Sequence, residues 1–285
     1  MIQGDNMRAI RQILTAEPVL EGAGVHLHRV FGYYQKPDFD PFLMLDDFRN
    51  DDPDKYLPGF PWHPHRGIET ITYMHEGSAE HGDSLGNKGT IHAGEVQWMT
   101  AGSGIIHQEM PKPDASGRMY GFQLWTNLPA SEKMCKPRYQ DIKASDITIN
   151  RSIPGLEVKV ICGQFGDTKG PVEDIYANPQ YWDVTLDANS SAELPAPMGT
   201  TCFIYIYKGI ALLGTQKAGN RQLVLFEDGN GISLRAGEEG LSFLYLNGKP
   251  LNEPISWRGP IVMNTPEEIR QAFKDLETGD FIKSH

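Results

Sequence analysis

Apolar side chains recur in short runs along most of the chain, and turn-forming residues separate the runs. The runs are rich in β-branched and aromatic residues, which is typical of strands. They cover residues 25–31, 68–76, 95–100, 120–128, 156–165, 180–186, 201–214, 221–226 and 241–248. Glycine, asparagine and aspartate lie between them, as in the segments GNKG and EDGNG, where turns are expected. So many short strands at close spacing predict an all-β fold built from barrels or sandwiches.

Two segments carry helix signals instead. Residues 128–137 predict a short helix, and residues 265–278 predict a longer one. In the longer one, Thr265 suits the N-cap, Pro266 suits the first helical position, and Glu268 completes a capping box. Its apolar residues fall on one stripe, which indicates packing rather than chemistry.

The strands fall into two comparable sets, divided at residues 137–150, where apolar periodicity is weak. A short internal sequence similarity, between YMHEGSAEH in the first set and YIYKGIALL in the second, supports two related β domains. We therefore expect one domain at residues 1–141 and another at residues 142–285, the second including the C-terminal helix.

Charge and cysteine content narrow the functional classes. The 285 residues have a formal net charge of −11, which argues against direct binding of nucleic acid, because phosphates require a basic surface. Cys135, Cys162 and Cys202 are widely spaced and form no C-x-x-C pair, as in proteins of a reducing compartment. The charged N-terminal segment does not fit a secretory signal, and no apolar run reaches the length of a membrane span. We expect a cytoplasmic protein without a membrane partner.

The histidines are distributed unevenly. Eight of the nine lie in the first 107 residues, so only the first half of the chain can build a metal site from imidazoles. His63 and His65 are separated by one residue, as are His107 and Glu109. Alternate residues of a strand point to the same face, so two such pairs on facing strands would supply three imidazoles and one carboxylate. That ligand set suits Fe(II), Mn, Ni, Cu or Zn.

A second His-x-His pattern shows the limit of this argument. His26 and His28 alternate with apolar residues, and no third ligand is near them in the sequence. We expect a polar or structural role for that pair. Spacing alone therefore leaves two interpretations open for His63 and His65: metal ligands, or polar residues on the solvent side of a strand.

The motifs HPHRG, VQWMTAG and GIIHQE within residues 60–111 resemble the pirin family, a branch of the cupins. The segments DPFLMLDDF at 40–48 and GPIVMNTPEEIRQAF at 259–273 also resemble pirins, so the similarity spans nearly the whole chain. It implies a bicupin: two cupin-type β-sandwich or jelly-roll barrels with a C-terminal α-helix, and one divalent metal ion in the first barrel only. The metal implied first is Fe(II), with Mn, Ni, Cu and Zn as alternatives.

The resemblance also implies roles for individual residues. The metal ligands would be His63, His65, His107 and Glu109, and Glu109 would also be the general base. The residues expected to surround the ligands or to line the pocket are Glu69, Asp46, Phe60, Met74 and Gln123.

Other residues near these motifs are expected to be structural. Glu69 is placed around the ligands rather than among them, because pirins take their carboxylate from the second cupin motif. We expect Trp98 and Trp125 in the core. Two roles are open for Arg66, orienting the site or forming a surface salt bridge, and the salt bridge is favoured.

The activity implied is that of a quercetin 2,3-dioxygenase, an oxidoreductase. A flavonol or other phenolic substrate would bind the metal through its 3-hydroxyl oxygen, dioxygen would be inserted, and carbon monoxide would be released. The alternative is a non-enzymatic regulator, in which bound iron senses the redox state and acts through protein partners. A wide pocket at the metal would favour the enzyme, and a closed metal site would favour the regulator.

Overall fold

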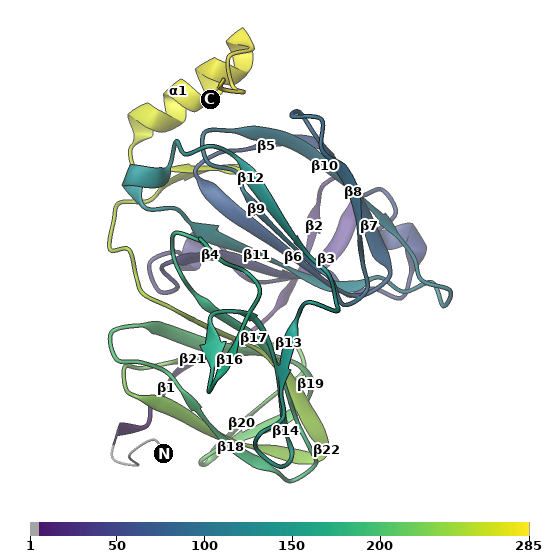
Figure 1. Ribbon diagram of the computed structural model, residues 1–285, viewed down its shortest axis with the longest axis vertical. Coiled ribbons are helices and arrows are strands. Elements are labelled where there is room, and N and C mark those ends of the chain that lie inside the picture. The colour runs from purple at the N-terminus through teal and green to yellow at the C-terminus, as the bar shows by residue number, and fades with distance from the viewer. Residues whose placement is uncertain (1–5, 285) are drawn as a thin grey trace. The chain divides into compact units, whose positions relative to one another are not determined.

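The structure, a computed structural model, describes residues 6–284 and consists of two compact units (Figure 1). One unit comprises a segment ending at Ala16, residues 38–40 and residues 145–250, and the other comprises residues 17–37, residues 41–144 and the segment from Leu251 onward. We call the first the histidine-free unit and the second the histidine-bearing unit, after their sequences. The sequence predicted two continuous domains, whereas contacts group the chain discontinuously. The boundary after residue 141 stays a prediction.

The histidine-bearing unit contains two antiparallel sheets. The seven-stranded sheet has the order β12 (Arg138–Ile142), β9 (Val96–Thr100), β6 (Ile68–Glu76), β11 (Tyr120–Asn127), β4 (Phe42–Asp47), β3 (Val25–Phe31), β2 (Glu17–Glu21). The four-stranded sheet has the order β5 (Phe60–His65), β10 (Ile105–Lys112), β7 (Ser78–Asp83), β8 (Lys88–His92). An apolar cluster joins them, with Leu27 and Met74 from the larger sheet and Ala79 and Ile91 from the smaller. This is the packing of a β-sandwich, in which two inner faces share one core.

The histidine-free unit is built on one nine-stranded antiparallel sheet. Its main path is β1 (Ile10–Thr15), β21 (Gln222–Phe226), β19 (Thr201–Leu213), β22 (Gly231–Gly248), β17 (Gln180–Leu186), β14 (Leu156–Cys162), β13 (Thr148–Asn150); β18 (Ser191–Pro195) pairs with β22 and β20 (Gln216–Gly219) with β19. A two-stranded ribbon, β15 (Gln164–Phe165) and β16 (Thr168–Lys169), lies between β14 and β17 along the chain. The pairing of the two longest strands, β19 and β22, shifts register between Ile206 and Lys208 and again between Gly209 and Ala211. Such bulges bend a sheet, so that one long sheet can enclose the large apolar core of this unit.

The C-terminal segment returns to the histidine-bearing unit. A short ribbon of β23 (Ser256–Arg258) and β24 (Ile261–Met263) precedes helix α1 (Pro266–Thr278). The predicted capping box is confirmed: the Thr265 side chain accepts from the Glu268 backbone, and the Glu268 carboxylate accepts from the Thr265 backbone. Ile269 and Ala272 bury the apolar stripe against β24. The all-β fold with one C-terminal helix is confirmed.

Several observed strands were not among the predicted runs, including the buried strand β4 and three polar ones. β5, β7 and β10 were not among the predicted runs, because FPWHPH, SAEHGD and IIHQEMPK hold few β-branched residues. The helix predicted at 128–137 is reduced to one 3-10 turn, η4 (Ala130–Glu132). The Cys135 carbonyl instead accepts from the Ser103 backbone, and Pro137 disfavours helical geometry at the residue before it. Two more such turns, η2 (Tyr33–Gln35) and η3 (Pro53–Lys55), lie in loops. Among the described residues no helix is long and apolar enough to span a bilayer.

Arg66 corrects another expectation. It is only 2% exposed, and its guanidinium donates to an Asp275 carboxylate oxygen at 2.8 Å and to the carbonyls of Ser103 and Phe281. The predicted surface salt bridge is therefore wrong. Asp275 belongs to helix α1, so the C-terminal segment supplies the partner in a buried ion pair.

Candidate metal centre

Three histidines converge on adjacent strands of the four-stranded sheet. β5 and β10 are antiparallel, and their register places His107 opposite His63 and Ile105 opposite His65. The candidate ligand nitrogens of His63, His65 and His107 all lie within 4.8 Å of one another. Among residues 6–284 this is the one group of three histidine, cysteine or carboxylate side chains with that geometry. We call it the histidine triad.

The hydrogen bonds of the imidazoles leave their other nitrogens for a shared cation. Nδ1 of His63 lies 2.8 Å from the Pro61 carbonyl oxygen, and Nδ1 of His65 lies 3.1 Å from the Pro260 carbonyl oxygen. If Nδ1 donates in both, the two Nε2 atoms, 3.0 Å apart, present lone pairs to each other. Both ring nitrogens of His107 are buried without a hydrogen-bond partner. Facing lone pairs and orphaned nitrogens are unfavourable in the protein alone, so these residues fit a metal ion.

Burial keeps the imidazoles of His65 and His107 neutral. It lowers the pKa of His65 to about 3, with a smaller effect from neighbouring His63. Burial also lowers the pKa of His107 well below its ordinary value, and repulsion from His65 adds to the effect. A neutral imidazole binds a metal without first losing a proton, so His65 and His107 can bind a divalent cation at neutral pH.

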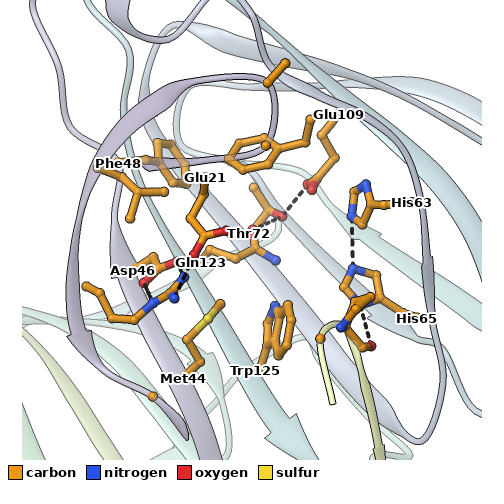
Figure 2. Close-up of a pocket in the computed structure, with 18 of the residues that line it drawn as sticks. Glu21, Met44, Asp46, Phe48, His63, His65, Thr72, Glu109, Gln123 and Trp125 are labelled. Atoms are coloured by element: carbon orange, nitrogen blue, oxygen red, sulfur yellow. Dashed lines mark hydrogen bonds and ion pairs between the residues drawn. The ribbon is translucent and has the colours of Figure 1, made fainter. Parts of the chain in front are cut away.

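Glu109 lies on the same strand but outside the close group. A β-bulge separates it from His107 in the pairing with β5. Its Oε1 is the acceptor for the Thr72 hydroxyl at 3.1 Å, and that hydroxyl also lies 2.7 Å from Oε1 of Gln123. Glu109 lines the same pocket as His63 and His65 (Figure 2). Its roles as ligand and base stay predictions.

His63 and His65 of the triad line a pocket of about 740 Å³, whereas His107 is buried and is not among the lining residues. The expected residues Asp46, Phe60 and Gln123 line it. Met74 instead packs in the apolar core between the sheets, and Glu69 is fully buried, accepting hydrogen bonds from Thr100 and Thr126. Neither of these two is among the pocket-lining residues.

The tryptophans divide between core and pocket. Trp98 is 1% exposed and belongs to the core as expected. Trp125 packs against an apolar core cluster as expected, but it also lines the pocket, with its ring centroid 5.0 Å from that of His65. Trp62 also lines the pocket and is 55% exposed.

Sequence reasoning missed several residues of the pocket. Glu21, Arg29 and Thr72 lie on separate strands and line it, and Trp257 and Gly259 reach it from the C-terminal ribbon. No motif joins these positions, and only the pairing of strands brings them together. His26, for which a polar or structural role was expected, is exposed. His81 stacks on Tyr139, and its Nε2 lies 2.9 Å from the Gln97 amide nitrogen.

Comparison with known proteins identifies the family to which this chain belongs. The family model "Pirin" matches residues 24–126, and the model "Pirin C-terminal cupin domain" matches residues 181–282. A Pseudomonas aeruginosa protein named "Putative quercetin 2,3-dioxygenase" is 45% identical over 280 residues, which cover 95% of this chain and 97% of that protein. The chain belongs to the pirin family. Human pirin is 37% identical over 281 residues, 96% of this chain and 93% of its own.

Solved structures agree with the pirin fold. The crystal structure named quercetin 2,3-dioxygenase from Acinetobacter baumannii superimposes with a TM-score of 0.89 at 35% identity, covering 96% of this chain and 98% of that one. The bicupin architecture expected from the resemblance is thereby confirmed. In this pirin the histidine triad is able to hold a metal ion.

Proposed function

We propose that this pirin is a metal-dependent dioxygenase that opens a flavonol such as quercetin. The observation that carries the proposal is the histidine triad, of which His65 and His107 are buried and neutral, and of which His63 and His65 line a pocket of about 740 Å³ that aromatic side chains also line. That volume lies within the usual range for small-molecule sites. It supports the enzyme over a regulator with a closed metal site. The names of the P. aeruginosa and A. baumannii proteins support the same reaction class.

His63, His65, His107 and Glu109 would hold one divalent ion, Fe(II) in this proposal. The bound ion would supply a Lewis acid for the substrate oxyanion and a redox centre for dioxygen. The ligand types also admit Mn, Ni, Cu or Zn.

The side chains of the pocket perform the remaining tasks. Glu109 takes the proton of the flavonol 3-hydroxyl, since a carboxylate within hydrogen-bonding reach meets the geometric requirement of a general base. Thr72 donates to Glu109 and so restricts the rotation of this carboxylate. Phe60 and Trp125 line the pocket and offer flat surfaces to the rings. In the overall reaction both dioxygen atoms enter the products, and one ring carbon leaves as carbon monoxide.

The test is anaerobic purification and metal analysis, followed by measurement of quercetin loss and carbon monoxide release under oxygen. We expect one equivalent of iron and turnover in the wild type, with turnover lost in His63→Ala and Glu109→Ala. The matched control is His92→Ala, an exposed histidine outside the triad. If the wild type binds iron and consumes no phenolic substrate, the enzyme proposal is wrong. The iron-bound regulator acting through a protein partner then becomes the leading hypothesis.

A further inference from the structure

A second set of charged side chains lines the same pocket away from the triad. Arg29 on β3 and Asp46 on β4 are register partners in neighbouring strands. Nε and Nη2 of Arg29 donate to the two oxygens of Asp46 at 2.9 and 2.8 Å, and Nη1 lies 2.8 Å from Oε1 of Glu21. Figure 2 shows Glu21 and Asp46 on one side of the pocket and His63 and His65 on the other. We call Glu21, Arg29 and Asp46 the acidic pole.

The acidic pole is a hydrogen-bond acceptor. Two carboxylates share one guanidinium, so the group carries one net negative charge when both are ionised. Each carboxylate oxygen has two lone pairs, and Arg29 occupies only some of them. Burial raises the pKa of Asp46 to about 6, although the bonds from Arg29 lower it. Asp46 is therefore mostly ionised at pH 7, with acceptor capacity toward the pocket.

This charge selects among ligands. Carboxylate, sulfate and phosphate groups would be repelled by the excess negative charge. An ammonium group would be attracted by the net negative charge but would also lie close to the guanidinium of Arg29, which repels it. A neutral hydroxyl donates its proton to a carboxylate without either conflict, and hydrogen bonds to charged groups are among the strong ones.

We propose that the acidic pole binds hydroxyl groups at the end of the substrate remote from the metal. This rests on the proposed function and narrows it: the substrate class is neutral aromatic molecules that carry hydroxyls at both ends. The acidic pole belongs to the seven-stranded sheet and the triad to the four-stranded sheet. Facing sheets lie about 10 Å apart, so a ligand that contacts both groups has the length of a molecule with several aromatic rings.

Three flavonols with the same 3-hydroxyl test this assignment. Quercetin carries hydroxyls on both outer rings, galangin lacks those of the catechol ring, and 3-hydroxyflavone lacks all of them except the 3-hydroxyl. The kcat/KM of the iron-loaded full chain is measured for each. We expect quercetin to exceed 3-hydroxyflavone by about tenfold or more, the usual effect of one hydrogen bond to a charged group. Galangin then identifies which ring reaches the acidic pole.

The variants Asp46→Asn and Glu21→Gln should each reduce this preference at least about fivefold. Glu21 is partly exposed, with 41% of its side chain accessible, so its replacement keeps a folded protein available if Asp46→Asn is unstable. Asp47→Asn is the matched control, because Asp47 is the neighbouring buried carboxylate, is paired with Arg49, and does not line the pocket. The control should keep the wild-type preference.

The two proposals fail in different ways. If the wild type turns over flavonols without preference, or both variants keep its preference, the acidic pole is not the recognition site. If no flavonol is turned over, the dioxygenase proposal fails. Equilibrium binding of the same three compounds to zinc-loaded protein, followed by tryptophan fluorescence, then tests the acidic pole by itself. A preference for quercetin that Asp46→Asn removes supports it, and equal binding of the three compounds overturns it.

Discussion

Replacing Asp46 by Asn should change the pH dependence of stability in a defined direction. Burial raises the pKa of Asp46 from 3.8 to about 6 in the folded protein. Between these pH values the folded state holds a proton that the unfolded state has released. Stability therefore falls as the pH rises through this window, and the contribution of protonated Asp46 is fully present below pH 3.8. A difference of about two pKa units corresponds to about 3 kcal/mol.

The assay is urea unfolding of metal-free wild type and Asp46→Asn across this pH range, since bound metal would add its own pH dependence. The wild-type free energy of unfolding minus that of the variant should fall by about 2 kcal/mol from pH 4 to pH 6.5, which is most of the full effect, and then level off. Other titrating groups are shared and cancel in the difference. The slope should persist in about 0.5 M salt, because a buried group is weakly screened. A difference that stays constant or rises with pH would refute the reasoning.

Three other changes have outcomes that follow from the contacts. His107→Ala should weaken zinc binding by more than about 100-fold in a competition titration, beyond the effect of losing an outer partner; wild-type affinity would remove His107 from the triad. Arg66→Leu deprives Asp275 of a buried partner and should lower the free energy of unfolding by about 3 kcal/mol, seen as a lower calorimetric midpoint; an unchanged midpoint would contradict this. Thr72→Val keeps the shape but removes the donor to Glu109, and should lower kcat/KM for quercetin about tenfold with unchanged iron content. Equal kcat/KM would show that Thr72 does not position Glu109.

The parts of the site that depend on local spacing could be predicted from the sequence. In a strand, residues i and i+2 point to the same face, so His63 and His65 lie on one side of β5 whatever the rest of the fold is. The acidic pole has no such signal. Arg29 and Asp46 meet because β3 and β4 pair in one particular register, and a shift of one residue would place Asp46 on the other face.

Burial by distant segments explains the other errors. Arg66 follows a polar motif and reads as a surface residue, but helix α1 supplies Asp275 to pair with it. Trp125 is a large apolar residue that was expected in the core, but it also lines the pocket. In both cases the environment comes from residues that no local pattern connects to the side chain. Family resemblance supplied the fold, but it did not supply these contacts.

The C-terminal segment shows how residues far away in the sequence can control the metal centre. The carbonyl of Pro260 holds Nδ1 of His65, and this contact directs Nε2 toward the other histidines. The next residue, Arg66, is held by Asp275 and the Phe281 carbonyl. His65 and Arg66 are thus oriented by residues that lie 195 and 209 positions later in the chain. Because second-layer contacts of this kind set ligand orientation, a change in the C-terminal segment can alter the triad without touching any residue that lines the pocket.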